Sequence, residues 1–453
     1  MTDTKHFFSS DGELSTVITG YQPRAAQLEM AEAIADAIEK KQHLIAEAGT
    51  GTGKTFAYLV PAILSGKKAI ISTGTKNLQD QLFNKDLPII RKAIKVPFIA
   101  ALLKGRSNYL CTYRLQNALT STLGFSKEDA LALAKIKSWS KRTKAGDISE
   151  MADVSEGDPV WYQATSTLDN CLGQDCPDYA ECFLVKARKK AQEADILVVN
   201  HHLLCADWSL RDSGFGELLP NAEVVIIDEA HQLADTASNF LGITVGAKQL
   251  NDLAQDALIE YYKDATDIPA LRTACEDLEH ESKDLRLAFG MELKRGEWQD
   301  IDNNPKISAG LQAVKEQLQR LTEQLKLAAV KTKALESCFN RAEELIQKLN
   351  LILDDRSGKW IRWYETHRKT FTLSLTPLDI AAEFHSFMQQ HKAAWIFTSA
   401  TLSIANKFDY FANNLGLSQA VSESCAVLLI TLTNPCFIIP KACRSRMTPN
   451  LYP

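Results

Sequence analysis

The chain has 453 residues, a hydrophobic content of 45% and a formal net charge of −5. This length predicts two or more domains, and the charge excludes a protein that is basic throughout, so any nucleic-acid surface has to be local. The sequence has no apolar signal-peptide core and no run of about 18 apolar residues, so we expect no membrane partner and a cytoplasmic location. Its ten cysteines, without a secretory signal, indicate a metal or catalytic role for any cluster of them rather than a disulfide framework.

The first predicted element is a helix in which apolar residues recur at helical spacing from Leu28 to Ile38. Gln27 lies at the start of this helix. Its amide offers both a donor and an acceptor, which would suit N6 and N7 of adenine. A solvated glutamine with no ligand is the alternative interpretation.

A glycine-rich segment, Ala46 to Thr55, follows between a predicted strand at 43–46 and a predicted helix at 56–64. This order is typical of a phosphate-binding loop, whose backbone N–H groups surround phosphate oxygens at the positive end of a helix dipole. Lys54 would reach the β- and γ-phosphates of ATP, and the Thr55 hydroxyl would bind Mg²⁺. The loop residues expected at ATP are Ala48, where the usual pattern has glycine, Gly49, Thr50, Gly51, Thr52, Gly53, Lys54 and Thr55.

Two more buried strands are predicted at 68–73 and 98–103, with a helix between them. Strands that alternate with helices are typical of an α/β fold in which crossover helices join parallel strands. We therefore expect one parallel sheet that carries the phosphate loop.

The composition then changes, which predicts an inserted module. Residues 104–144 contain nine Lys or Arg and two acidic residues, whereas residues 145–182 contain nine acidic residues and no Lys or Arg. A basic face with Tyr109, Tyr113 and Trp139 nearby would track a phosphate backbone and stack bases. A solvated charged surface without a ligand is the alternative.

The same module contains a group of cysteines. Cys171, Cys176 and Cys182 have four and five residues between them, and Cys111 lies 60 residues upstream of the first. Four thiolates can hold a zinc ion or an iron–sulfur cluster, and this loose spacing suits a larger cluster better than one small ion. Unrelated buried thiols are the remaining alternative.

After the module the strand pattern returns at 194–204 and again at 223–231. The second run places Asp228 and Glu229 at the carboxyl end of a parallel strand, where open α/β sheets bind ligands. Asp228 would hold Mg²⁺, and Glu229 would orient and deprotonate the water that attacks the γ-phosphate. His231 would couple this site to a neighbouring segment.

The third part of the chain begins with a helical pattern from about 236 to 354, clearest in the leucine-rich stretch 311–353. Strands are expected at 360–364 and 371–375, and another at 394–402 ends in Thr-Ser-Ala-Thr. The hydroxyls of Ser399 and Thr401 would lie at the same sheet edge as Asp228 and link the ATP site to a second domain.

Taken together, these motifs resemble the DinG/YoaA/XPD-type superfamily 2 DNA helicases, and most closely their bacterial YoaA-like branch. The resemblance covers residues 20–420. It is carried by Arg24 with Gln27, the 48–55 loop, Ser72-Thr73-Gly74-Thr75, the four cysteines, Val199-Asn200-His201-His202-Leu203, Asp228-Glu229-Ala230-His231 and Thr398-Ser399-Ala400-Thr401-Leu402.

The resemblance implies a RecA-like P-loop fold with two insertions. The RecA-like domain would take residues 1–103, 194–236 and 357–424, with an iron–sulfur module at 104–193 and a helical arch at 237–356. A 4Fe–4S cluster is implied on Cys111, Cys171, Cys176 and Cys182, together with ATP and Mg²⁺ as cofactors and Arg24 at the nucleotide. The implied activity is ATP-driven 5′-to-3′ movement on single-stranded and forked DNA in replication and repair, with a repair or replication protein as partner and a nucleoid-associated location in bacteria.

The resemblance ends near residue 424. Family members continue into a second RecA-like domain that completes the ATP site, whereas residues 425–453 form an atypical tail, for which a frameshift or truncation is our hypothesis. We therefore expect this chain to unwind DNA poorly. The alternatives are a non-catalytic fragment that binds ATP and single-stranded DNA, and a zinc-stabilised ATPase without a DNA role.

Overall fold

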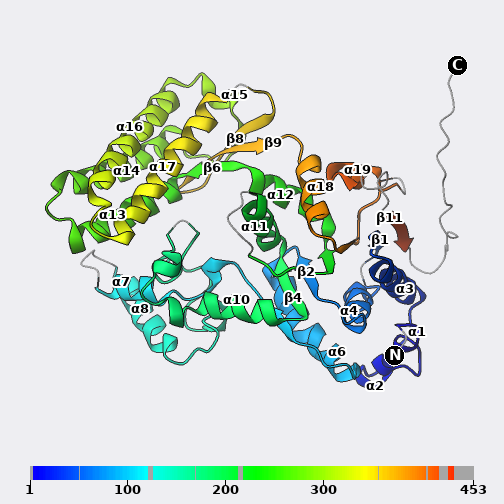
Figure 1. Cartoon of the computed structure of the whole chain (residues 1–453). Helices are drawn as coiled ribbons and strands as arrows, with labels where there is room; N and C mark the ends of the chain where they lie inside the picture. The colour runs from blue at the N-terminus through cyan, green and yellow to red at the C-terminus, as the bar shows by residue number, and fades with distance from the viewer. Residues whose placement is uncertain are drawn as a thin grey trace, which may run out of the picture. The chain divides into compact units, whose positions relative to one another are not determined.

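The computed structural model describes residues 4–49, 51–120, 126–168, 170–212, 218–355, 357–404, 407–417 and 427–432. The chain divides into two compact units, each assembled from segments far apart in the sequence (Figure 1). The first unit comprises Met1–Leu103, Lys190–Ala237 and Asp379–Pro453, and the second comprises Lys104–Lys189 and Ser238–Leu378. None of the helices in the described ranges is long and apolar enough to cross a membrane.

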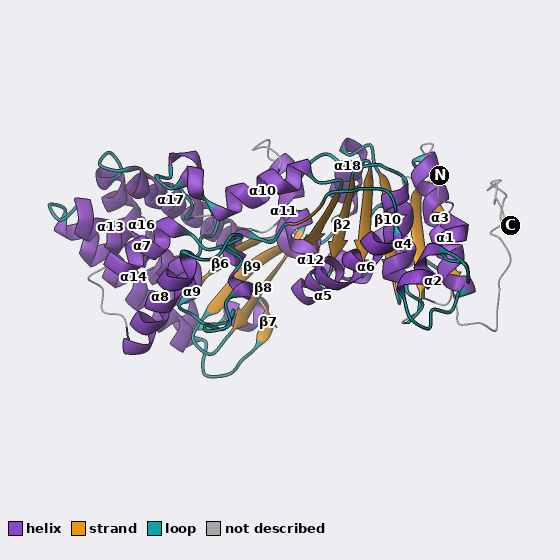
Figure 2. Cartoon of the chain, turned by 90° about the horizontal axis from the view of Figure 1, so that it is seen from below, coloured by secondary structure: helices purple, strands orange, loops and turns teal. Residues whose placement is uncertain are grey.

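The first unit is built around a parallel sheet of seven strands in the order β11-β1-β10-β5-β2-β4-β3 (Figure 2). This arrangement confirms the predicted RecA-like α/β fold. The strands are β1 (His43–Ala48), β2 (Ala69–Thr73), β3 (Ala100–Leu102), β4 (Ile196–Asn200), β5 (Val224–Asp228), β10 (Ala394–Ser399) and β11 (Val427–Leu432). The backbone of β11, in the atypical tail, pairs with β1 along its whole length.

Helices cover both faces of this sheet, which explains why its strands read as continuous apolar runs. Alternate strand residues pack with α3 (Ala25–Lys40), α4 (Lys54–Leu64) and α6 (Leu87–Ala93) on one face. On the other face, aromatic side chains of β10 pack with Phe384 of α18 (Ala381–Gln390), which in turn contacts Trp208 of α11 (His201–Asp212). The remaining helices of this unit are α1 (Thr4–Phe7), α2 (Glu13–Val17), α5 (Lys76–Gln81), the π-helix η1 (Leu82–Asp86), η6 (Ala230–Gln232) and α19 (Asp409–Asn414), while α10 (Phe183–Glu193) and α12 (Leu233–Leu241) cross the boundaries between the units.

One strand prediction was wrong in part. The run at 194–204 was expected to be a strand throughout, but β4 ends at Asn200 and α11 begins at His201. The Asn200 side-chain oxygen accepts a hydrogen bond from the Leu203 N–H (2.9 Å), which caps the first turn and allows the helix to start directly after the strand.

The second unit contains the cysteine module, which has a small core of its own. Trp139 and Trp161 pack edge to face in this core, with ring centroids 6.0 Å apart. Tyr109 and Trp139 are 5% and 8% exposed, so the prediction that both stack bases is wrong, and Tyr113 is only half-buried. The helices of the module are η2 (Arg106–Asn108), α7 (Thr112–Thr120), α8 (Lys127–Ser140), η3 (Ile148–Glu150), α9 (Trp161–Ala164), η4 (Gly173–Asp175) and η5 (Tyr179–Glu181).

The rest of the second unit is a helical bundle that packs against a small antiparallel sheet. The helices are α13 (Ala247–Asp264), α14 (Pro269–Ala288), α15 (Gln299–Asp302), α16 (Pro305–Ala328) and α17 (Lys333–Asp354). The predicted leucine-rich helices are confirmed as α16 and α17, although one leucine of this stretch, Leu327, is 62% exposed. The sheet order is β6-β9-β8-β7, from β6 (Ile243–Gly246), β7 (Arg295–Glu297), β8 (Trp360–Thr366) and β9 (Phe371–Pro377).

This second sheet corrects two expectations. The stretch 236–354 is not helical throughout, because β6 and β7 interrupt it. β8 and β9 pair with these two strands rather than with the parallel sheet, so residues 357–378 fold with the bundle and not with the RecA-like part.

Candidate active site

The parallel sheet brings five predicted motifs to one edge. β1, β2, β4, β5 and β10 are all parallel, and their carboxyl ends are Ala48, Thr73, Asn200, Asp228 and Ser399. The candidate site therefore lies where these strands end, and its polar side chains come from the residues at or just after each strand end.

The phosphate loop leaves β1 after Ala48 and enters α4 at Lys54. Gly51 and Gly53 have φ values of +81° and +83°, which side-chain-bearing residues rarely adopt. Within the loop, Thr52 donates hydrogen bonds from its N–H (3.4 Å) and its hydroxyl (2.9 Å) to the carbonyl of Gly49. Thr50 lies outside the described residues.

Two residues from the segment before β1 hold this loop from outside. Gln27, 5% exposed, donates from its amide to the Gly53 carbonyl (3.0 Å), and a Cβ at Gly53 would lie 2.1 Å from the same amide. The exposed Arg24 guanidinium donates to the Gly51 carbonyl. The structure thus shows both side chains on the loop backbone, and their contact with adenine or ATP stays a prediction.

Lys54 and Glu229 meet at the centre of the site although 175 residues separate them in the sequence. The Lys54 Nζ lies 3.5 Å from Oε1 of Glu229, and both side chains are partly exposed, at 12% and 24%. Glu229 has φ +54°, a left-handed backbone conformation that costs a glutamate roughly 1–2 kcal/mol. The turn at Glu229 therefore has to be stabilised by its neighbours.

Asp228 is buried beside this pair and has two hydroxyl partners. The Tyr58 hydroxyl donates to Oδ2 (3.1 Å), and the Thr398 hydroxyl donates to Oδ1 (3.2 Å). Burial raises the pKa of Asp228, and the nearby charge of Glu229 raises it further. The Thr55 side chain counteracts part of the rise in the pKa of the same tyrosine, so the two predicted Mg²⁺ ligands, Thr55 and Asp228, both influence Tyr58.

The predicted coupling residues are brought together in part. His231 Nδ1 lies 2.8 Å from the Ser399 hydroxyl and 3.4 Å from Oε2 of Glu229. The Ser399 hydroxyl is itself 3.4 Å from Glu229 Oε2. Thr401 contributes its backbone N–H to Ser399 (3.3 Å), but its side chain is exposed.

Two contacts at this edge were not found from the sequence. Tyr58 follows Lys54 by one helical turn, so the helix spacing itself could have placed its hydroxyl under the loop. Glu47 accepts hydrogen bonds from the backbone N–H groups of Leu402 and Ser403 and from the Ser403 hydroxyl, and it ties β1 to the segment after β10. No local pattern indicates this second contact, because the partners lie more than 350 residues apart.

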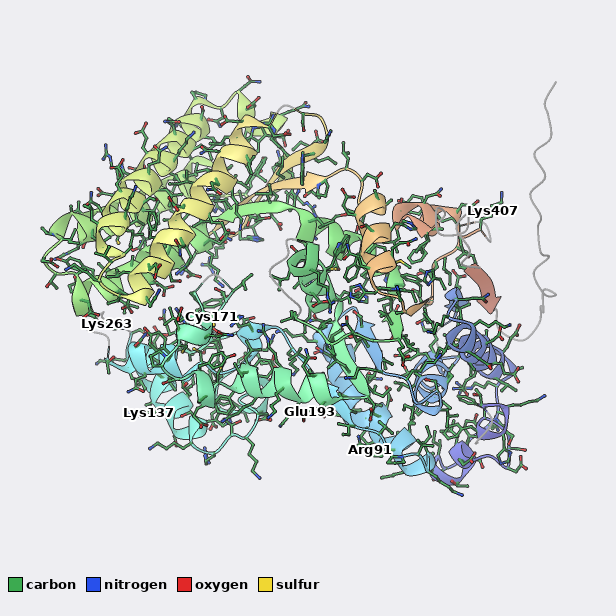
Figure 3. All side chains as sticks on the ribbon, viewed as in Figure 1. Arg91, Lys137, Cys171, Glu193, Lys263 and Lys407 are labelled. Carbon is green, nitrogen blue, oxygen red and sulfur yellow. The ribbon has the colours of Figure 1, made fainter. Side chains whose placement is uncertain are left out.

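The cysteine module holds its four predicted ligands as half-buried free thiols, and Cys171 is labelled in Figure 3. Burial raises the pKa of Cys111 to about 11, and the charges of Cys176 and Cys171 add to this rise. In the described part of the chain, no group of three or more His, Cys, Asp or Glu side chains is close enough to hold a metal ion.

Arg188 gives this group of thiols a cationic neighbour. Burial and the charge of Arg106 lower the pKa of Arg188, whereas Cys171 and Cys182 counteract that change. Its Nε is buried, and no described residue makes a hydrogen bond to it. An anionic metal–thiolate group would satisfy this charge, so the residues present fit the predicted cluster in chemistry.

The site and the sheet define a P-loop fold of the RecA-like class, and helicase families match parts of the chain. The DEAD/DEAH box helicase family matches residues 26–126, and the DEAD_2 family matches residues 158–250. The YoaA ATP-dependent DNA helicase of Haemophilus influenzae is 45% identical over 419 residues, which cover 92% of this chain and 66% of that protein. The YoaA helicase of Escherichia coli (strain K12) is 44% identical over 422 residues, 93% of this chain and 66% of that protein.

The chain is thus similar to the YoaA DNA helicases over most of its length and carries matches to the DEAD/DEAH box helicase and DEAD_2 families. It spans 66% of the length of these two YoaA relatives. A solved structure of an XPD helicase matches at 14% identity with a TM-score of 0.48, over 90% of this chain and 62% of that one.

Proposed function

We propose that the protein is, by descent, an ATP-dependent DNA helicase of the type that moves 5′ to 3′ along single-stranded DNA at forked substrates, in replication or repair, and that the chain itself binds ATP and single-stranded DNA but unwinds DNA poorly. The observation that carries the proposal is the approach of Lys54 to Glu229, 3.5 Å apart at the carboxyl edge of the parallel sheet. A phosphate-loop lysine opposite a carboxylate is the arrangement that ATP hydrolysis requires, because charge stabilisation and water activation meet at the γ-phosphate.

In this proposal each side chain has one task. Lys54 binds the β- and γ-phosphates, which releases Glu229 from its ion pair to orient and deprotonate the attacking water. Asp228 and Thr55 hold Mg²⁺, which supplies electrostatic stabilisation of the phosphates. The hydroxyls of Tyr58 and Thr398 fix the Asp228 carboxylate, and the contacts of His231 with Ser399 and Glu229 transmit the state of the site to its surroundings.

The nucleotide site is tested by ATP binding and by DNA-stimulated hydrolysis in the Lys54→Ala variant. We expect loss of hydrolysis and at least roughly tenfold weaker ATP binding, since the lysine contacts the phosphates directly. Lys40→Ala is the matched control, because Lys40 is an exposed lysine on α3 whose partner is Asp36.

Hydrolysis by Lys54→Ala at the parental rate would contradict the proposal. ATP binding by the parent chain without turnover would support the alternative of a non-catalytic fragment. Strand displacement from duplexes with a 5′ or a 3′ single-stranded tail tests the polarity, and preference for the 3′ tail would overturn it.

We also propose a 4Fe–4S cluster on Cys111, Cys171, Cys176 and Cys182, supported by the shared environment of these thiols and the buried charge of Arg188. Protein purified without oxygen should contain iron and absorb visible light, and Cys171→Ala should lose both. Cys205→Ala is the control, since Cys205 is buried in α11 of the other unit. A colourless protein that contains zinc would favour the zinc alternative.

A further inference from the structure

His201 is a buried histidine at the carboxyl edge of the parallel sheet. The proposed roles in nucleotide binding and hydrolysis do not include it. It is the first residue of α11 and is 0% exposed. The preceding residue fixes the backbone position of His201. Asn200 ends the pairing of β4 with β2, and its side chain caps the helix that begins at His201. The imidazole therefore enters the space between the ends of the strands.

One ring nitrogen of His201 is anchored on β2. Nδ1 lies 2.7 Å from the hydroxyl of Ser72, which is also 0% exposed and pairs in register with Ile227 of β5. A neutral imidazole carries one N–H, on the nitrogen that does not accept a hydrogen bond.

The other ring nitrogen faces the acidic turn. Nε2 is buried and, among the described residues, has no hydrogen bond of normal geometry, although the backbone of Asp228 and Glu229 adjoins the ring. If the Ser72 hydroxyl donates to Nδ1, the single N–H of the ring resides on Nε2. A buried N–H group that lacks a hydrogen-bond acceptor costs roughly 1–3 kcal/mol of folding free energy. Contact between this N–H and the backbone carbonyls of the turn is therefore favourable.

The turn that His201 adjoins is the one with the unusual backbone. Glu229 adopts φ +54° and ψ +46°, and its conformation directs the carboxylate toward Lys54. Such a left-handed glutamate persists only where surrounding groups hold it.

We propose that His201, anchored by Ser72, is a positioning residue that holds the Asp228–Glu229 turn in its left-handed conformation and so keeps Glu229 in place to activate water. This inference rests on the proposed ATP hydrolysis. His201 acts through the backbone and does not touch the phosphates, so it affects the rate of hydrolysis and not the affinity for ATP.

Two substitutions separate the two ring nitrogens. Asparagine in His201→Asn can replace Nδ1 and keep the contact with Ser72, but it is too short to reach the turn. Glutamine in His201→Gln can place an amide N–H near the position of Nε2. The exposed neighbour His202, changed in His202→Asn, is the matched control.

We expect His201→Asn to lower kcat for single-stranded-DNA-stimulated ATP hydrolysis roughly 10- to 100-fold, with KM for ATP within about twofold of the parent. His201→Gln should recover most of that loss, and His202→Asn should match the parent. Hydrogen–deuterium exchange at residues 224–232 should accelerate in His201→Asn and not in the phosphate loop. Parental kcat together with parental exchange in His201→Asn would overturn the inference.

The exchange measurement keeps the two proposals distinguishable. If the parent chain does not hydrolyse ATP, the proposed function fails on turnover, whereas accelerated exchange confined to 224–232 still supports the role of His201. If His201→Asn does not fold, Ser72→Ala decides, because it removes the anchor and leaves the imidazole. Unchanged exchange at 224–232 in folded Ser72→Ala would then overturn the inference.

Discussion

At the scale of single residues, the site depends on two hydroxyl groups that hold the Asp228 carboxylate, and one of them, that of Tyr58, lies outside the predicted motifs. Asp228 is buried, and a buried carboxylate without partners would cost several kcal/mol. Tyr58 and Thr398 supply these partners from α4 and β10. The neighbouring charge that Asp228 brings also raises the pKa of Tyr58, after the larger effect of burial, so that the phenol keeps its proton and remains a donor.

The Tyr58→Phe variant tests this arrangement. Loss of the phenol leaves one carboxylate oxygen without its 3.1 Å partner, and a hydrogen bond to a charged group contributes about 1.5–3 kcal/mol. We expect the Mg²⁺ concentration that half-saturates ATP binding to rise roughly tenfold, with a normal fold. Tyr410→Phe is the control, since Tyr410 is a tyrosine of the same unit that is 64% exposed. Equal Mg²⁺ requirements in both variants would contradict the role of Tyr58.

At the scale of elements, the sequence predicted those parts of the site that end a parallel strand. Lys54 and Glu229 could be paired without a structure, because a phosphate loop and an acidic strand end of one parallel sheet share an edge. Tyr58 and Glu47 could not be found in this way, since their partners depend on the order of the strands. β1 and β5 both lie beside β10, an order that no local pattern reveals.

The beginning of α11 shows why one element boundary was missed. The apolar run of β4 continues into Leu203 and Leu204, so hydrophobicity alone favours a longer strand. The Asn200 side chain decides otherwise, because it caps a helix one residue later. The base-stacking prediction failed for a related reason: aromatic residues near basic ones indicate a surface, whereas Trp139 is needed for the small core of its module.

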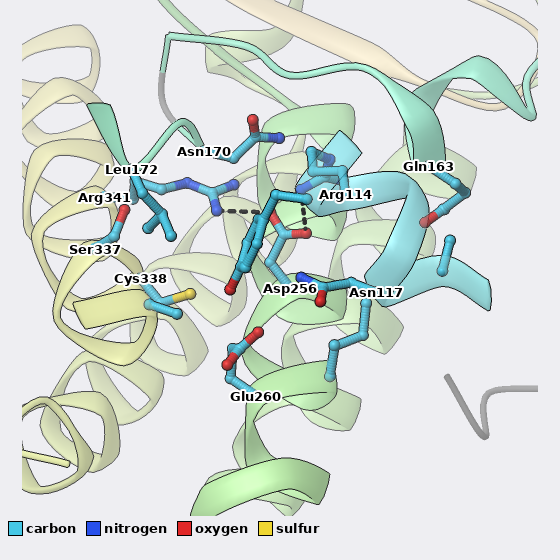
Figure 4. Close-up of a pocket in the computed structure, with 14 residues that line it drawn as sticks. Arg114, Asn117, Gln163, Asn170, Leu172, Asp256, Glu260, Ser337, Cys338 and Arg341 are labelled. Atoms are coloured by element: carbon cyan, nitrogen blue, oxygen red, sulfur yellow. Dashed lines mark hydrogen bonds and ion pairs between the residues drawn. The ribbon is translucent and has the colours of Figure 1, made fainter. Parts of the chain in front are cut away.

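At the scale of the whole molecule, segments far apart in sequence are joined inside the second unit by one carboxylate. Asp256 of α13 lies between Arg114 of α7 (2.9 Å) and Arg341 of α17 (2.7 Å), as Figure 4 shows. The first arginine belongs to the cysteine module and the other two residues to the helical bundle. Burial alone would raise the pKa of Asp256, but the two arginines outweigh it, and the net pKa lies below the usual value.

Asp256→Asn should therefore separate the cysteine module from the helical bundle more readily. Removal of the negative charge breaks two largely buried ion pairs, and breaking a buried ion pair typically costs about 3–5 kcal/mol. We expect a lower urea midpoint for the second unit and faster hydrogen–deuterium exchange in α7 and α17. Glu276→Gln is the control, because its ion pair with Arg272 is 51% exposed on both sides and contributes at most about 1 kcal/mol.

The pH dependence of stability provides a second measurement on Asp256→Asn and Glu276→Gln. Since the pKa of Asp256 is lower in the folded protein, its contribution to stability is present above the carboxyl pKa of the unfolded chain and is lost as the pH falls through the folded pKa. Asp256→Asn should remove this part of the acid sensitivity, whereas Glu276→Gln should retain it. An acid-denaturation profile of Asp256→Asn that parallels the parent would show that the two arginines find other partners, and that the carboxylate does not join the module to the bundle.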